Sequence, residues 1–307
     1  MIYTLTLNPA LDKTLTVPSF SAGKVNRVLS ARLDPGGKGI NVSKTLKELG
    51  ADSVAMGILG GSAGEYILKA LSDMGIKGDF VRSQRPTRTN IKLFDPVTRV
   101  TTDINEAGGI DPEDFALLKS RLKSVLKAGD ICVISGRLDG LNVDAGAWIS
   151  EISLSGAEVF LDTQGKALKA GVYSGAYMIK PNAEEMAELT GCAVDTFDDA
   201  AARAKEILDI SPVQAVLVSM GREGAVYADG ENMLYAESPH IQAASSVGAG
   251  DSMLAGFVCG RSGGMSADEC FRLSVACGAA AAGTQGSASP DKETVYSLLS
   301  QVKIRRV

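Results

Sequence analysis

Val-Gly-Ala-Gly-Asp-Ser-Met-Leu-Ala-Gly-Phe, residues 247–257, is the stretch that most constrains the fold of this chain. Two glycines bracket a small residue, Asp251 follows, and an apolar helical run begins at once. Glycine lets the backbone come close to a ligand, and a helix start presents unpaired N–H groups and a positive dipole end. Such a turn favours phosphate binding. The alternative is an ordinary loop in which Asp251 caps the helix.

Asp251 is not expected to bind phosphate itself, because like charges repel. A carboxylate at this place is better explained as a base that takes a proton from an incoming hydroxyl group. A base beside an anion-stabilising turn is typical of phosphoryl transfer to an alcohol.

Short apolar segments alternate with amphipathic ones over most of the chain. Strand-like segments cover 2–7, 53–59, 131–135, 158–162, 178–180 and 213–219, and helical patterns cover 40–49, 64–74, 112–126, 143–155, 183–189 and 198–208. This alternation predicts an α/β fold, with a mostly parallel sheet between two layers of helices. In the last third, consecutive helices are predicted over 250–263, 266–282 and 292–300.

Four early segments do not follow that rhythm. Residues 13–17, 25–33, 89–94 and 100–104 alternate polar and apolar side chains, with turn signals between them. They predict a small antiparallel β-sheet, built from segments near 11–34 and 88–105. Because so thin a sheet cannot bury both faces alone, it should cover a site as a lid or pair with a second copy of itself. No linker separates it, so a single domain over 1–307 is expected.

Composition limits the class of protein. The 307 residues are 45% apolar, enough for a substantial core, and the net charge of −5 with mixed signs argues against a nucleic-acid partner. No apolar run approaches the length of a membrane span, and the N-terminus resembles a strand more than a signal peptide. Five cysteines lack metal-site spacing. We therefore expect a cytoplasmic protein without a membrane partner.

His240 is the only histidine, and we expect it at the surface or a strand edge. A single histidine argues against a triad hydrolase and a multi-histidine metal site. Catalysis then depends on carboxylates, amides, lysines, arginines and a bound metal.

Two N-terminal motifs are candidates for binding a polyol. Asn8–Asp12 follows the first strand, where Asp12 could accept hydrogen bonds from hydroxyl groups or simply form an Asx-type turn. Residues 34–41 form a second glycine cluster that opens a helix and includes Asn41. This cluster lacks the Gly-Lys-Ser/Thr ending of a P-loop, and a generic glycine turn is its alternative.

Two further groups of charged and amide side chains each have a possible binding role and a possible structural role. Lys24, Arg27 and Arg88 lie in the predicted small sheet and could grip a second phosphate, or remain solvated charges. Asn182 and Glu185 share a helix face and could hold the water shell of Mg²⁺. They also fit a capping box, and the two roles are compatible.

Two further segments also have two explanations. The glycine turn at 219–225 could run close beside nucleotide phosphates, or it could be a plain β-turn. The small residues of 277–283 could let a flat ring lie against a helix, although helix packing is the commoner cause.

Taken together, these motifs resemble those of the ribokinase-like (PfkB) carbohydrate kinases, and the resemblance runs from end to end. Residues 36–42 and 247–251 match the two signatures of that family. Segments 4–9, 25–27, 87–93 and 245–252 are most similar to the phosphosugar branch that contains the 1-phosphofructokinases, with the tagatose-6-phosphate kinases close by.

The resemblance implies a ribokinase-like three-layer α/β/α sandwich with a β-lid that also joins a homodimer. It implies ATP-dependent phosphorylation of a ketohexose monophosphate with Mg²⁺, leaving a K⁺ requirement open. Fructose 1-phosphate is the expected substrate; tagatose 6-phosphate and fructose 6-phosphate are alternatives. Two other classes stay open, a non-catalytic sensor of nucleotide or sugar phosphate and an NAD-dependent dehydrogenase, although the first strand leads into Asn8-Pro9 and not Gly-x-Gly-x-x-Gly.

The resemblance also implies roles for matching residues. Asp251 would be the catalytic base, and the amides of Gly248, Ala249 and Gly250 would form the anion hole. The residues expected to hold the phosphosugar are Asp12, Lys24, Arg27, Gly36, Gly37, Lys38, Asn41, Arg88 and Ser135. Those expected to bind the nucleotide are Lys180, Asn182, Ser219, Gly221, Gly224 and Gly250, and Mg²⁺ would be organised by Asn182 and Glu185.

One segment departs from the family pattern. Residues 135–140 are Ser-Gly-Arg-Leu-Asp-Gly, where relatives usually have a turn like Ser-Gly-Ser-Leu-Pro. We expect Arg137 and Asp139 to alter the substrate contacts at this turn and the choice of phosphosugar.

Overall fold

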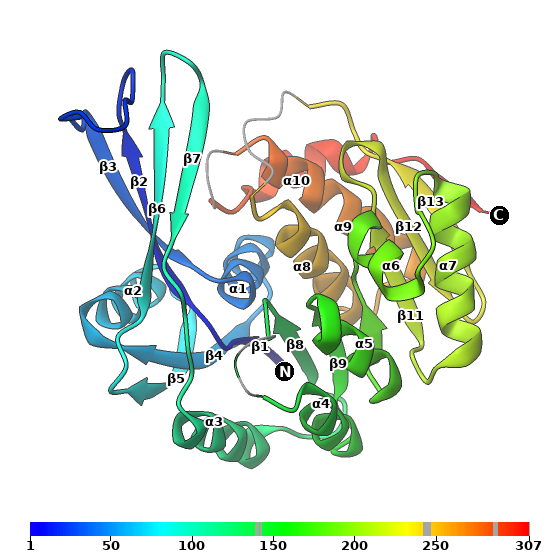
Figure 1. Ribbon diagram of the computed structural model, residues 1–307. Helices are drawn as coiled ribbons and strands as arrows, with labels where there is room; N and C mark the ends of the chain where they lie inside the picture. Colours follow the sequence, from blue (N-terminus) through cyan, green and yellow to red (C-terminus); the bar gives the residue numbers. More distant parts are fainter. Residues whose placement is uncertain (139–140, 142, 242–246, 285–287, 307) are drawn as a thin grey trace.

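The computed structural model describes residues 1–138, 141, 143–241, 247–284 and 288–306. These residues form a ten-stranded sheet with helices on both faces and a separate four-stranded sheet that projects from one side (Figure 1). We call them the large sheet and the small sheet. The predicted α/β fold with two sheets is confirmed.

The large sheet is parallel through seven neighbouring strands. In spatial order these are β11 (Ala215–Ser219), β10 (Met178–Ile179), β9 (Glu158–Asp162), β8 (Ile131–Ser135), β1 (Ile2–Thr6), β4 (Ser53–Gly60) and β5 (Lys77–Ser83). Beyond β11, the strands β12 (Gly224–Asp229), β13 (Met233–Glu237) and β14 (Ile304–Arg306) add antiparallel neighbours. The parallel part places the carboxyl ends of its strands along one edge of the sheet.

Helices cover both faces of the large sheet. One layer holds α3 (Pro112–Val125), α4 (Ala145–Leu154), α5 (Gly165–Tyr173), α6 (Ala183–Thr190) and α7 (Phe197–Ile210). The other holds α1 (Lys38–Leu49), α2 (Gly61–Asp73), α8 (Ala249–Ser262), α9 (Ala267–Ala282) and α10 (Lys292–Leu299). Alternate side chains of β1 serve the two cores: Ile2 packs with α1 and α8, and Tyr3 and Leu5 pack on the opposite face. The result is the expected α/β/α sandwich.

The small sheet has the order β3 (Ser30–Gly36), β2 (Ala10–Thr16), β6 (Arg88–Asp95) and β7 (Val100–Asn105). Its outer pairs are antiparallel as predicted, but the central pair β2–β6 is parallel. The reason is continuity, because β2 and β6 extend the chain beyond the parallel strands β1 and β5. Residues 25–29, predicted as part of a strand, precede β3 and lie outside it.

Several elements of the described chain were absent from the predictions, among them β5, α5, β13 and β14. β5 is an edge strand in which only Phe80 and Val81 are buried, and α5 is a short helix of nine residues. Such short or largely exposed elements offer few residues on which a pattern can be recognised, so the sequence did not indicate them. Within the described residues, none of the helices combines the length and hydrophobicity needed to cross a bilayer.

Candidate active site

A cavity of about 1100 Å³ opens at the carboxyl ends of the parallel strands. Thr6, Ser135, Asp162 and Ser219 end the strands β1, β8, β9 and β11 and line it. Ligands of open α/β sheets usually bind at this edge. The register explains part of the arrangement, because Ser135 on β8 lies directly beside Asp162 on β9.

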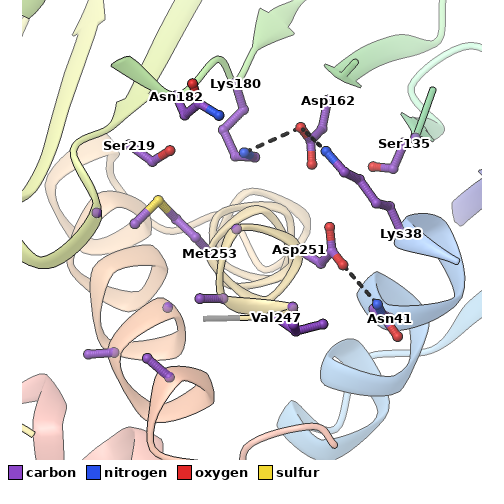
Figure 2. A pocket seen from close by; sticks show the side chains of 18 of the residues that line it. Lys38, Asn41, Ser135, Asp162, Lys180, Asn182, Ser219, Val247, Asp251 and Met253 are labelled. Atoms are coloured by element: carbon purple, nitrogen blue, oxygen red, sulfur yellow. Dashed lines mark hydrogen bonds and ion pairs between the residues drawn. The ribbon is translucent and has the colours of Figure 1, made fainter. Parts of the chain in front are cut away.

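The glycine turn at the start of α8 forms one wall of the cavity. Gly248 adopts a left-handed conformation with φ of 80° and provides no side-chain cap for the helix. The first N–H groups of α8 therefore lack intrahelical partners, and residues 248–250 line the cavity. Asp251, in the first turn of α8, is 5% exposed and accepts a 2.8 Å hydrogen bond from Nδ2 of Asn41 on α1 (Figure 2).

The electrostatic setting of Asp251 favours a base that works near neutral pH. Burial, and then the negative charge of Asp162, raise the pKa of Asp251 to about 6. Lys38, Lys180 and the hydrogen bond from Asn41 act in the opposite direction. The carboxylate is therefore ionised above pH 6 but keeps more proton affinity than an exposed aspartate.

The side of the cavity next to the small sheet is polar. Asp12 on β2 accepts a 3.0 Å hydrogen bond from Nδ2 of Asn90 on β6. A Cβ on Gly36 would lie 2.8 Å from Oδ2 of Asp12, so this glycine makes room for the carboxylate. The Arg88 guanidinium donates to the backbone carbonyls of Asn8 and Glu106, and its Nε is buried without a partner among the described residues. Such donors and acceptors suit a sugar phosphate.

The opposite side of the cavity is largely apolar and lies against α8 and α9. Its lining includes Met253, Val275, Gly278, Ala279 and Ala282. A Cβ on Gly278 would approach Met253 Cε to 3.2 Å, so the small residues of α9 serve helix packing as well as opening space. Both explanations of this small-residue segment, helix packing and space for a flat ring, are compatible with the structure.

Asn182 and Glu185 form a capping box at the start of α6. Oδ1 of Asn182 accepts a 2.8 Å hydrogen bond from N–H of Glu185, and Oε2 of Glu185 accepts one of 2.9 Å from N–H of Asn182. The predicted cap is confirmed. Both residues also line the cavity, and an amide with a carboxylate is a donor set that suits Mg²⁺ when phosphate oxygens supply further ligands. Across the described residues, no cluster of three or more His, Cys, Asp or Glu side chains could hold a metal.

Comparison with known proteins identifies the family. Residues 6–294 match the model of the pfkB family carbohydrate kinases. The chain belongs to this family. It is 35% identical to a 1-phosphofructokinase of Borreliella burgdorferi over 100% of this chain and 99% of the relative, and 36% identical to a 1-phosphofructokinase of Bacillus subtilis over 100% of both. The structure of phosphofructokinase-2 from Escherichia coli in complex with potassium matches with a TM-score of 0.93, 29% identity and 98% coverage of each chain.

The structure of this pfkB kinase gathers most of the residues that the sequence singled out. The predicted residues that line the cavity are Asp12, Gly37, Lys38, Asn41, Arg88, Ser135, Lys180, Asn182, Glu185, Ser219, Gly221, Gly224, Gly248, Ala249, Gly250 and Asp251. Arg137, the departure from the family pattern, lines it too, whereas Asp139 falls outside the described residues.

Three predicted residues do not line the cavity. Lys24 and Arg27 are exposed in the segment between β2 and β3, and Gly36 only makes room for Asp12. Within one chain, the interpretation of Lys24 and Arg27 as substrate contacts is therefore not supported by their position. His240 is exposed as expected, but it also contributes to the cavity wall.

Asp162 is a charged residue of the cavity that the sequence did not single out. It is 1% exposed, and its Oδ1 lies 3.3 Å from Nζ of both Lys38 and Lys180. A signal was present, because this acid ends an apolar strand and the carboxyl ends of parallel strands form the ligand edge. Its partners are far away in the sequence, so the ion pairs themselves were not visible there.

Proposed function

We propose that this chain catalyses the ATP-dependent phosphorylation of a ketohexose monophosphate, converting fructose 1-phosphate to fructose 1,6-bisphosphate. The observation that carries the proposal is the buried carboxylate of Asp251 beside the unpaired N–H groups of α8, between a polar and an apolar part of one cavity. The relatives named 1-phosphofructokinase support this choice of substrate. They give no support to the dehydrogenase or sensor alternatives.

The reaction uses Asp251 as the general base. Its ionised carboxylate takes the proton of the sugar 6-hydroxyl while the hydroxyl oxygen forms a bond to the γ-phosphorus of ATP. The bond from that phosphorus to the β–γ bridging oxygen breaks, and ADP leaves. The N–H groups of Ala249 and Gly250, with the Lys180 ammonium, stabilise the charge on the transferring phosphoryl group. Mg²⁺, organised by Asn182 and Glu185, supplies further charge neutralisation when bound with the nucleotide.

Substrate recognition is divided between hydroxyl and phosphate contacts. Asp12, Asn41 and the backbone at Gly37 would hold sugar hydroxyls, and Ser135 offers a buried Oγ that has no partner among the described residues. Arg88 would bind the phosphate that does not react. The guanidinium of Arg137 lies where relatives usually carry a serine and would add a second cation to that end. Tagatose 6-phosphate and fructose 6-phosphate remain the competing substrates.

The small sheet would act both as a lid and as the contact of a homodimer. Its strands and the adjoining segments expose Val25, Leu29, Val100 and Ile104, and β7 is exposed along its whole length. Apolar side chains gathered on a thin sheet favour association with a second copy. A structure of the E. coli phosphofructokinase-2 describes a tetrameric inhibited form, so relatives do associate.

We further propose a cytoplasmic location and a stimulating effect of K⁺. The potassium complex of the E. coli relative supports the second point. Assays with KCl replaced by tetramethylammonium chloride would test it, since equal rates in both salts would contradict a K⁺ requirement.

The decisive experiment measures ADP release across a panel of phosphosugars. Fructose 1-phosphate, fructose 6-phosphate, tagatose 6-phosphate and unphosphorylated fructose are compared for kcat/KM. Fructose 1-phosphate should give the highest value, and fructose should be a poor substrate because it lacks the phosphate for Arg88. Turnover of none of them would reject the kinase proposal.

A further inference from the structure

The buried carboxylate of Asp162 lies at the centre of an ion cluster with Lys38 and Lys180, and the reaction described above uses Lys180 but assigns no role to Asp162. Its Oδ1 is 3.3 Å from Nζ of Lys38 and 3.3 Å from Nζ of Lys180, as Figure 2 shows. Its Oδ2 is buried and has no hydrogen-bond partner within the described part of the chain. Two ammonium groups therefore share one carboxylate oxygen, while the other oxygen remains without a donor.

These contacts are long for charge-assisted hydrogen bonds, which usually span about 2.7–2.9 Å. Sharing a single oxygen weakens each contact, so either lysine can turn to a stronger anionic partner. Burial alone would lower the pKa of Lys38, but the charges of Asp162, Asp251 and Glu185 outweigh it and raise that pKa above the usual value. Lys38 thus stays charged and available for phosphate.

Both lysines line the same cavity as the glycine turn and Asp251. A Cβ on Gly250 would lie 3.3 Å from Nζ of Lys180, so this ammonium lies against the glycine turn. Lys38 comes from α1, three residues before the Asn41 that holds Asp251. The pair therefore connects the carboxylate of Asp162 with the anion hole and the base.

We propose that Asp162 is a positioning residue that holds Lys38 and Lys180 away from Asp251 in the ligand-free enzyme and releases them to the phosphates of the substrates. Held on Asp162, the lysines leave Asp251 with the proton affinity that a base requires. This inference depends on the proposed function only in taking Asp251 as the base.

The direction of the effect follows from the charges that face Asp251. They are Asp162 on β9, Lys38 and Lys44 on α1, and Lys180 after β10. Loss of the Asp162 charge would remove a neighbour that raises the pKa of Asp251. It would also free both lysines to approach Asp251 and lower that pKa further.

The test is a titration of the Asp251 carboxyl carbon by ¹³C NMR in the ligand-free enzyme. The signal is assigned by its loss in Asp251→Asn, and the wild-type midpoint is expected near pH 6. Asp162→Asn should lower the midpoint by about one unit or more. An unchanged or higher midpoint would overturn the proposal. Because the measurement needs no turnover, it is independent of the phosphosugar panel.

A double-mutant cycle tests whether the effect passes through the lysines. Lys38→Met should raise the Asp251 midpoint, and Asp162→Asn should lower it less in the Lys38→Met background than in the wild type. Equal shifts in both backgrounds would show that Asp162 acts on Asp251 only by direct charge repulsion. That result would reject its role in positioning the lysines. If Asp162→Asn does not fold, Lys38→Met and Lys180→Met remain informative, since an unchanged midpoint in both would also reject it.

Thr163→Val provides the matched control. Thr163 is the next residue, is 1% exposed, and its Oγ1 has no partner among the described residues. The variant should leave the Asp251 midpoint unchanged. A shift equal to that of Asp162→Asn would show that any change at this strand end is enough, and would overturn the specific role of Asp162.

Discussion

Charged side chains are buried at the carboxyl edge of the large sheet, whereas they are exposed beside the strands of the small sheet. At the large sheet, Asp162, Lys180 and Asp251 are 1%, 4% and 5% exposed. On the small sheet, β7 is exposed along its whole length, and Lys24 and Arg27 lie exposed between β2 and β3. Burial, together with the neighbouring charges that it strengthens, changes the proton affinity of the side chains at the large sheet.

At the junction of the two sheets, one charged side chain is buried and another is partly exposed. Asp12 is 8% exposed near the start of β2, and Arg88 is partly buried at the start of β6, where Ala10 and Arg88 are paired. Burial lowers the pKa of Arg88 below its usual value, although it stays a cation. In the proposed mechanism, the buried edge carries out the chemistry and the junction recognises the substrate. Four experiments test this distinction.

Asp251→Asn should have the largest effect. The variant keeps the shape of the side chain but cannot accept the proton, so kcat should fall by about 100- to 10,000-fold while the affinity for ATP changes little. Steady-state kinetics with equilibrium nucleotide binding measure both. Turnover close to the wild type would remove Asp251 from the mechanism and leave the buried edge without a chemical role.

The same substitution should stabilise the protein at alkaline pH. The pKa of Asp251 is raised to about 6 in the folded state and is about 3.9 when unfolded, so the folded state loses stability as pH rises between these values. Asp251→Asn should therefore increase the free energy of unfolding at pH 8 by about 2–3 kcal/mol. Urea denaturation should show the gain disappearing near pH 4. If the variant were less stable than the wild type at pH 8, the inferred free-energy cost of burying the Asp251 charge would be wrong.

Arg88→Ala tests the junction. Removal of the guanidinium should raise KM for the phosphosugar by about 10- to 100-fold, the equivalent of one charged hydrogen bond, and leave KM for ATP nearly unchanged. Arg85→Ala is the control, because Arg85 is exposed, pairs with Asp111 at 2.7 Å and does not line the cavity. If KM for ATP rose equally, Arg88 would have a structural role and the division between edge and junction would fail.

Ile104→Asp on β7 should have the smallest effect on the stability of one chain. Ile104 is exposed, so the free energy of unfolding should change by less than about 0.5 kcal/mol. Sedimentation velocity should nevertheless show dissociation into monomers. Ile210→Asp, on the exposed end of α7, is the control and should remain associated. A dimer that survives Ile104→Asp would place the contact elsewhere.

Local signals predicted the framework well because they arise within a few residues. The apolar run of β8 and the amphipathic pattern of α7 each contain their own evidence of period and length. The capping box of Asn182 and Glu185 needs a spacing of only three residues. In contrast, β5 was missed because only Phe80 and Val81 of its seven residues are buried, and α5 was missed because it is only nine residues long.

Three features can be read from the residues alone: the alternation of strands and helices, the glycine turn before α8, and the presence of Asp251 at the start of that helix. These depend on backbone conformation and on short periodic patterns. Only the tertiary structure decided that Asp162 meets Lys38, 124 residues away, and that Lys24 and Arg27 stay outside the cavity. The reason is physical: a carboxylate acquires its proton affinity from burial and from the charges around it, and those neighbours are brought together by folding.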